Sequence, residues 1–440
     1  MSANASDAGT GRHDDFRAQA RSLARAGEMA RAEGAFASLL EQVPDDPEAA
    51  DFLAACRLAR GQSADAVALL ESAARAHAGN AVLLTSLGIA RLHAGNAGSA
   101  ATALRESLAH APENFVARLY LGNAVERLGR APEALALYFG AIHFAQERGA
   151  WRDEDSVPPA LRPLLRHAMQ RAIAGRRELF RRALEPLRVR HGAAALARVE
   201  RALAIYLLDA PPGYPDPRQR PSFLFFPGLP AAPYYARTRF PWMGELESRT
   251  GAIREEMLGL LDARENFEPF HKHVPSDGYL RGTRGAPAWD TFFFHRHGEP
   301  VAANRARCPA TAAALDAVPL ARIRGHAPEC LFSVLRPGTH ILPHHGVTNT
   351  RLVVHLPLIV PADCALAVGG EAHAWREGVA VVFDDSFEHE AWNKSDRARA
   401  VLILDVWHPD LAEAERAAIT DLVGAIGDFN DACGINTPRA

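Results

Sequence analysis

The sequence predicts a chain of several domains, with an N-terminal all-α repeat region followed by a C-terminal all-β domain, a double-sheet roll with flanking helices. At 440 residues the chain is long for a single domain. A glycine recurs every 34 residues in its first third, which indicates a helical repeat. Short β-branched and apolar runs bounded by Gly, Pro, Asp and Asn fill the segment 330–409, which is typical of an all-β sheet.

The repeat region covers residues 12–148, contains four units and resembles tetratricopeptide repeats. Its turn glycines are each followed five positions later by an alanine, and they are Gly27, Gly61, Gly95 and Gly129. Glycine permits a tight turn between paired helices, and small alanines let the helices approach closely. Such stacks present a concave groove, which we expect to bind a peptide, a substrate or a partner protein. The alternative is that the groove only packs against the C-terminal domain.

Three other segments complete the division of the chain. Residues 1–11 are small and polar, and they predict a disordered tail. Residues 149–209 are rich in Arg, Ala and Leu, and they predict a helical connector. A run of turn residues that begins at Ala210 marks the start of the all-β domain, residues 210–440.

Composition argues against several classes of function. The formal net charge of -3 gives no electrostatic reason to expect nucleic-acid binding. No apolar run is long enough to span a bilayer, so we expect no membrane span. The five cysteines are scattered and form no CxxC pair, which favours a reducing compartment, the cytoplasm, over a disulfide framework or a zinc site. The oligomeric state is left open.

Strand periodicity predicts which side chains meet in the all-β domain. In the run RLVVHLPLIV, Arg351, Val353 and His355 share one face, because alternate residues of a strand point to the same side. The turn residues after Asn393 should fold the chain back, so that Arg399 lies opposite His389 in an antiparallel pair.

Two histidines, His344 and His389, should then converge with Arg399 inside the roll. Imidazole nitrogens suit Fe(II), and an arginine fork pairs with a carboxylate. A facial triad of iron ligands would add a carboxylate two residues after the first histidine, but that position is Gly346. Such a site would hold only two protein ligands; the alternative is that both histidines are structural. Acidic residues near His389 could either supply the missing carboxylate or bond to the backbone of their turn, and they are Asp384, Asp385 and Glu388.

Three segments carry a resemblance to a known family: PGTHILPHHGVTNTRLVVHLPL, WREGVAVVFDDSFEHEAWN and LILDVWHPDL. They resemble the aspartyl/asparaginyl β-hydroxylases, which are iron- and 2-oxoglutarate-dependent oxygenases built on a double-stranded β-helix, or jelly roll. The resemblance extends more weakly upstream and covers roughly 221–411. This family also has glycine in place of the acidic member of the triad.

The resemblance implies Fe(II), 2-oxoglutarate as cosubstrate and O2. It implies that His344 and His389 are the iron ligands, and that Arg399 and Ser333 contact the distal carboxylate of 2-oxoglutarate. His355 corresponds to the contact at the other end of the cosubstrate. Val353 stands where well-known members have a second arginine.

The resemblance also implies β-hydroxylation of an aspartyl or asparaginyl side chain, in a peptide or protein delivered by the repeats. Arg351 is a candidate for holding an acidic substrate side chain, and a salt bridge at the rim is its alternative role. His345 points away from its neighbour His344 and is a second candidate for substrate contact. Two other functions stay open: a related oxygenase that acts on a lipid or small molecule, and a repeat scaffold without enzymatic activity.

Overall fold

The computed structural model describes residues 5–263, 267–270, 278–283 and 286–435, with the backbone alone for 5–12. These residues form two compact units. The helical unit runs up to residue 176 and includes 429–435, and the sheet unit covers residues 177–428. The division along the chain falls inside the connector expected over residues 149–209.

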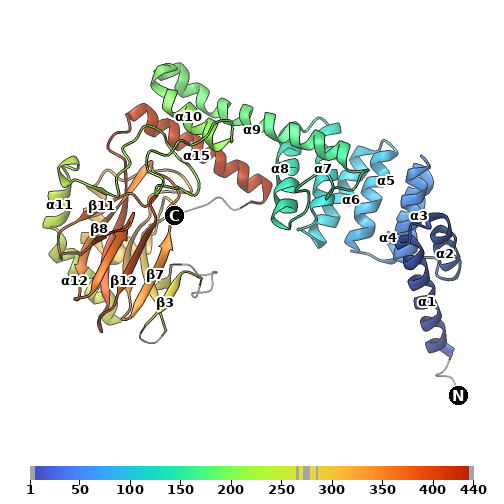
Figure 1. Ribbon diagram of the computed structural model, residues 1–440, viewed down its shortest axis with the longest axis horizontal. Helices are drawn as coiled ribbons and strands as arrows, with labels where there is room; N and C mark the ends of the chain where they lie inside the picture. The colour runs from blue at the N-terminus through green and yellow to red at the C-terminus, as the bar shows by residue number, and fades with distance from the viewer. Residues whose placement is uncertain (1–4, 264–266, 271–277, 284–285, 436–440) are drawn as a thin grey trace. The chain divides into compact units, whose positions relative to one another are not determined.

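The helical unit contains four consecutive helix pairs (Figure 1). Their bounds are α1 (Ala5–Arg25), α2 (Met29–Gln42), α3 (Pro47–Ala59), α4 (Ser63–Ala76), α5 (Ala81–His93), α6 (Ala97–His110), α7 (Phe115–Arg127) and α8 (Ala131–Glu147). The glycine of each turn has a φ between +77° and +80°, a conformation that favours glycine. The alanines five positions later are buried between helices. The predicted repeat is therefore confirmed, and its spacing reflects these two steric requirements.

The N-terminal segment differs from its prediction. Helix α1 begins at Ala5, so the tail expected to be disordered over residues 1–11 is helical from there onward. A helix held by packing further along can extend into such a segment, because adding a residue to an existing helix costs much less than nucleating a new one.

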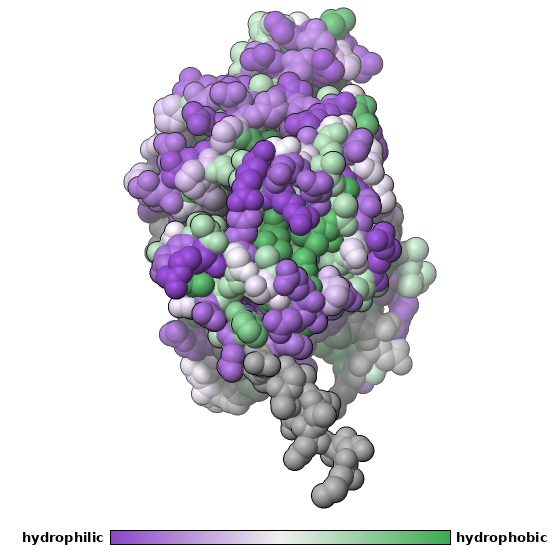
Figure 2. Space-filling view, turned by 90° about the vertical axis from the view of Figure 1, so that its right-hand side faces the viewer, coloured by the Kyte–Doolittle hydropathy of each residue, from purple (hydrophilic) through white to green (hydrophobic). Residues whose placement is uncertain are grey.

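The remaining helices belong to the connector and the all-β domain. They are α9 (Arg162–His191), η1 (Ala194–Leu196), α10 (Ala197–Tyr206), η2 (Arg237–Arg239), α11 (Met243–Ser248), α12 (Thr250–Ala263), α13 (Ala302–Arg307), α14 (Pro309–Asp316) and α15 (Glu413–Cys433). No described helix combines the length and apolar character that crossing a membrane would require. The face of the molecule shown in Figure 2 is largely hydrophilic, with hydrophobic residues gathered in a central hollow.

Two antiparallel sheets form the sheet unit. The larger has the order β1-β11-β8-β13-β6-β4-β2, with β5 beside β4, and the smaller has the order β10-β9-β12-β7-β3. The bounds of the strands are β1 (Tyr234–Tyr235), β2 (Glu268–Pro269), β3 (Leu280–Gly282), β4 (Trp289–Arg296), β5 (Glu299–Pro300), β6 (Cys330–Leu335), β7 (Thr339–His344), β8 (Arg351–Ile359), β9 (Cys364–Val368), β10 (Glu371–His373), β11 (Val381–Phe383), β12 (His389–Asn393) and β13 (Arg399–Trp407). The predicted double-sheet roll is confirmed.

The two faces of the larger sheet bury different cores. On the outer face, Leu352 and Leu404 pack with Ile253 of α12, which runs along the outside of β8 and β11 (Figure 1). The inner face, which carries Val353, belongs to a second core shared with Leu366 of the smaller sheet. The alternation predicted for RLVVHLPLIV therefore separates a structural face from a face that lines the space between the sheets.

One predicted strand pairing is wrong. His389 does not pair with Arg399, because β12 lies between β7 and β9 of the smaller sheet, whereas β13 lies between β6 and β8 of the larger one. The turn after Asn393 carries the chain from one sheet to the other instead of closing a hairpin. The partner of His389 across β7 is His344.

Candidate active site

A cavity of about 340 Å³ contains the predicted site residues in the sheet unit. Those lining it are His344, His345, His389, Arg399, Ser333, His355 and Arg351. The lining also includes aromatic and aliphatic side chains, among them Phe270, Trp289, Leu331, Ile341 and Phe383. The predicted residues therefore meet even though the hairpin predicted to join them is absent, because β12 and β13 face each other from opposite sheets.

His344 and His389 lie side by side on neighbouring strands. Their ring centroids are 4.1 Å apart, and the two residues are cross-strand partners in β7 and β12. Each Nδ1 bonds to a carbonyl oxygen two residues earlier, at 2.8 Å for His344 and 3.1 Å for His389. These bonds fix the orientation of both rings and leave Nε2 of each available as a ligand.

Electrostatics keeps this pair of imidazoles neutral. Burial, followed by the neighbouring His344, lowers the pKa of His389 to about 3. Burial also lowers the pKa of His344. A neutral imidazole is the form that binds a metal ion. Among the described residues no group of three or more His, Cys, Asp or Glu side chains is arranged to hold a metal, so a metal at this cavity would take its protein ligands from the histidine pair.

Arg399 is the largest fully buried side chain described, with 1% of its surface exposed. Its Nη1 donates a long hydrogen bond of 3.5 Å to Ser333 Oγ, and its Cζ lies 4.7 Å from the ring centroid of Trp375. Its Nε has no hydrogen-bond partner within the described part of the chain. Burial lowers the pKa of Arg399 to about 10, and no carboxylate of the described residues forms an ion pair with it.

Ser333 and His355 complete this end of the cavity. Ser333 Oγ accepts a hydrogen bond of 2.9 Å from Trp289 Nε1, which holds the hydroxyl in place. Burial and then the charge of Arg399 lower the pKa of His355 well below its usual value. The Nδ1 of His355 is buried and lacks a hydrogen-bond partner among the described residues. This end therefore offers a cation and unfilled hydrogen-bonding groups to a ligand.

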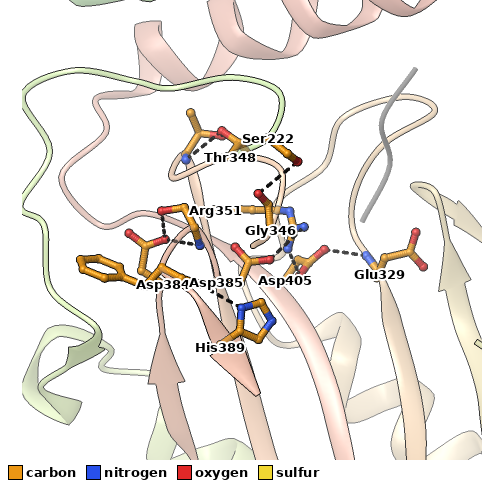
Figure 3. Close-up of polar contacts among 12 residues, drawn as sticks. Ser222, Glu329, Gly346, Thr348, Arg351, Asp384, Asp385, His389 and Asp405 are labelled. Atoms are coloured by element: carbon orange, nitrogen blue, oxygen red, sulfur yellow. Dashed lines mark hydrogen bonds and ion pairs between the residues drawn. The ribbon is translucent and has the colours of Figure 1, made fainter. Parts of the chain in front are cut away.

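Arg351 occupies a different environment in the same cavity (Figure 3). Its Nη1 donates a hydrogen bond of 2.7 Å to Asp405 Oδ1, and its Nη2 lies 3.4 Å from Asp385 Oδ2. Burial opposes its charge, but Asp405 and Asp385 outweigh burial and raise the pKa of Arg351. The salt bridge expected at the rim is therefore a buried ion pair, with Arg351 3% exposed.

Gly346 is in contact with the carboxylate of Asp385. A Cβ added at Gly346 would lie 2.2 Å from the Asp385 Cγ, and the Gly346 amide donates a hydrogen bond of 2.6 Å to the Asp385 carbonyl. The position where a facial triad has its acidic residue therefore has no room for a side chain here. The Asp385 carboxylate fills that space, and its Oδ2 lies 3.4 Å from Arg351 Nη2.

The other two acidic residues near His389 are Asp384 and Glu388, and they have different surroundings. Asp384 accepts hydrogen bonds from the Ser386 backbone and from Gln219. It therefore bonds to the backbone of its own turn, which is one of the two roles expected from the sequence. Glu388 is exposed and does not line the cavity. The sequence alone assigned no role to Asp405, Trp289 or Trp375. Asp405 could have been predicted to lie near the site, because alternation along its strand places it on the same face as Arg399.

Comparison with known proteins gives two family matches. Residues 247–409 match the family model "Aspartyl/Asparaginyl beta-hydroxylase". Residues 17–81 and 85–147 match the model "Tetratricopeptide repeat". The first match contains all the predicted site residues, and the second covers the helix pairs of the helical unit.

Three curated relatives match the sheet unit. The Mus musculus protein "Aspartate beta-hydroxylase domain-containing protein 2" is 37% identical over 213 residues, which are 48% of this chain and 60% of the relative. The "Ornithine lipid ester-linked acyl 2-hydroxylase" of Rhizobium tropici is 35% identical over 180 residues, 40% of this chain and 61% of the relative. The "Aspartyl/asparaginyl beta-hydroxylase" of Homo sapiens is 33% identical over 201 residues, 44% of this chain and 25% of the relative.

The matched regions thus span less than two thirds of each relative's own length. The relatives differ in the substrates that their names state, whereas the matched region is common to all of them. Within the sheet unit, residues 247–409 thus match the aspartyl/asparaginyl β-hydroxylase family model, and the segments that match tetratricopeptide repeats precede them in the helical unit.

Proposed function

We propose that this protein is a dioxygenase that depends on Fe(II) and 2-oxoglutarate and hydroxylates the β-carbon of an aspartyl or asparaginyl side chain in a peptide or protein. The observation that carries the proposal is the arrangement at one end of the cavity. A neutral histidine pair with free Nε2 atoms lines the same space as a buried arginine that has no carboxylate partner among the described residues. The first suits a metal, and the second suits an acidic cosubstrate.

The residues present fit an iron ion. His344 and His389 would hold it, since rings 4.1 Å apart can both reach one ion when a metal–imidazole bond is about 2 Å long. Iron bound there would supply the redox chemistry in which O2 and 2-oxoglutarate become succinate and CO2, while one oxygen atom enters a substrate C–H bond.

The residues also fit 2-oxoglutarate. Arg399 and Ser333 would bind its distal carboxylate, because the unpaired guanidinium lacks an anion and the hydroxyl stands beside it. His355 would contact the other end of the cosubstrate through its unfilled Nδ1. Trp289 lies against Ser333 and Trp375 lies against Arg399. These rings would limit the access of water to the bound carboxylate, and ionic hydrogen bonds are stronger where water is excluded.

The repeats suggest how a substrate would arrive. We propose that the groove of the helical unit binds the peptide substrate or a partner protein, since tetratricopeptide stacks present extended binding surfaces. The five cysteines are all unpaired, which fits the cytoplasm, the reducing compartment that we propose for the protein.

A second candidate function is the hydroxylation of a lipid acyl chain. The apolar part of the cavity lining supports it, as does the name of the Rhizobium tropici relative, an acyl 2-hydroxylase. Mass spectrometry of cell extracts incubated with the protein separates the two candidates, because the added oxygen would appear on peptides in one case and on lipids in the other.

Succinate formation tests the iron and cosubstrate assignment. The full chain supplied with Fe(II), 2-oxoglutarate and O2 should release succinate, and His344→Ala and His389→Ala should abolish this release. His340→Ala is the matched control, because His340 lies on the same strand as His344, is ion-paired to Glu390 and does not line the cavity. A His344→Ala variant that turns over at the wild-type rate would remove the iron assignment.

A further inference from the structure

The charges in the cavity limit what the substrate can carry. The described lining residues include two arginines and three carboxylates, and they are Arg351, Arg399, Glu329, Asp385 and Asp405. Arg399 is the cation assigned above to the cosubstrate. Arg351 is already bound by Asp405 and Asp385. With the cosubstrate bound, a second anion would therefore meet no described arginine or lysine of the lining that is free of a carboxylate partner.

The strand position between the two polar residues Arg351 and His355 could hold a further cation, but it is occupied by the apolar residue Val353. Val353 is on the inner face of β8, between Arg351 and His355, and it lines the cavity. Its cross-strand partners are Phe383 on β11 and Asp405 on β13. The surroundings of this position are thus a carboxylate and apolar groups, which disfavour an anion.

The ion pair of Arg351 still has unfilled hydrogen-bonding capacity. Arg351 Nη2 and Asp385 Oδ1 are both buried and have no hydrogen-bond partner in the described part of the chain. Glu329 adds negative charge near Arg351, although its carboxylate points away from Arg351 in Figure 3. The Glu329 Oε1 lies 2.8 Å from His297 Nδ1. One donor beside one acceptor complements a carboxamide, which accepts through its oxygen and donates through its nitrogen. A carboxylate can accept from Arg351 but is repelled by Asp385.

We propose that the active site selects asparaginyl over aspartyl side chains, an inference that rests on the proposed function and specifies its substrate class. The carboxamide oxygen faces Arg351 and its N–H group faces Asp385, while Val353 itself supplies no counter-ion for a carboxylate. Asparagine and aspartate have nearly the same shape, so the discrimination comes from charge and hydrogen bonding. We expect kcat/KM to favour asparagine by a factor of about 100 or more.

The test uses the full chain with two peptide libraries that are identical except for a fixed central residue, Asn in one and Asp in the other. Hydroxylation is measured as the added mass of one oxygen atom, and succinate is measured in parallel. Wild-type protein should hydroxylate the Asn library and leave the Asp library almost unchanged. Equal hydroxylation, a preference for Asp, or succinate release without hydroxylation of either library would overturn the selectivity and leave the dioxygenase assignment standing.

Variants make the test specific to these residues. Val353→Arg should shift the Asn to Asp ratio at least tenfold toward Asp, and Val353→Leu is the apolar control that should keep the wild-type ratio. Asp405→Asn, which keeps the side-chain shape and frees part of Arg351, should shift the ratio in the same direction if Val353→Arg does not fold. An unchanged ratio in a folded Val353→Arg or Asp405→Asn protein contradicts the proposal. A wild-type protein that releases no succinate at all overturns the proposed function together with it.

Discussion

The two buried arginines of the cavity have the same side chain and nearly the same burial, but different partners. Arg351 lies against Asp405 and Asp385, which raise its pKa. Arg399 has a serine hydroxyl at 3.5 Å and an aromatic ring, and burial lowers its pKa to about 10. Arg351 is the first residue of β8 and Arg399 is the first residue of β13, and both line the cavity from the larger sheet. Their positions in their strands therefore do not explain the difference.

This difference separates a structural charge from one that is available to a ligand. The two charges of a buried ion pair compensate each other, and removing one partner leaves an uncompensated charge in the protein. A buried charge without a counter-ion is unfavourable until a ligand supplies one, so such groups gather at functional sites. The same residue type therefore predicts two different phenotypes in this cavity.

The largest expected effect comes from the unpaired arginine. Arg399→Ala should raise the KM for 2-oxoglutarate by about 100-fold or more, because a buried charge-assisted contact to a carboxylate is lost. The midpoint of thermal unfolding should stay the same or rise, since an uncompensated buried charge is removed. Steady-state succinate release and thermal unfolding measure the two quantities.

Arg397→Ala is the matched control for this substitution, because Arg397 is an exposed arginine two residues earlier. It should change neither quantity. A marked loss of stability in Arg399→Ala would mean that the two arginines play the same role, and the contrast between them would fail.

The paired arginine should show the opposite pattern. Arg351→Ala should lower the free energy of unfolding by about 3–5 kcal/mol, because the buried carboxylates of Asp405 and Asp385 would lose their counter-ion. Chemical denaturation measures this loss. The double variant Arg351→Leu/Asp405→Leu should recover part of it, since it removes both members of the closest pair. If the single variant is as stable as wild type, the ion pair does not contribute to the fold.

The contact between Gly346 and Asp385 should give a smaller effect. Gly346→Ala should destabilise the protein by about 1–3 kcal/mol, because its Cβ would overlap the Asp385 carboxylate. A double-mutant cycle with Asp385→Ala should show coupling, with the pair less destabilised than the sum of the single variants. Additive effects would mean that the glycine is needed for another reason.

Two glycines of the helical unit should give effects no larger than this one and leave the site untouched. A Cβ at Gly122 would lie 2.7 Å from ring carbons of Tyr138, whereas Gly129 has a φ of +77° and open space around it. Gly122→Ala should cost about 1–3 kcal/mol through overpacking, and Gly129→Ala about 1 kcal/mol through backbone strain. Succinate release without peptide should stay at the wild-type level in both. A loss of that release would show that these positions affect more than the helical unit.

The sequence predicts much of this architecture because its signals are local. The glycine period fixes the helix pairs, and the alternation in RLVVHLPLIV places Arg351, Val353 and His355 on one face. The pairing of His389 could not be predicted in the same way. A turn after Asn393 can close a hairpin or cross between sheets, and the choice depends on which strand edges are already occupied by β7, β9, β6 and β8. The partners of Arg351 were missed for the same reason, since Asp405 comes from a strand 54 residues away.

Anaerobic titration with Fe(II) and 2-oxoglutarate tests the central claim most directly, because it measures binding without turnover. Wild-type protein should develop the visible charge-transfer absorption of iron chelated by 2-oxoglutarate. His344→Ala should develop none, and Arg399→Ala should need far more 2-oxoglutarate to reach the same absorption. A wild-type protein that binds neither iron nor 2-oxoglutarate under these conditions, or a His344→Ala variant that matches it, would contradict the account.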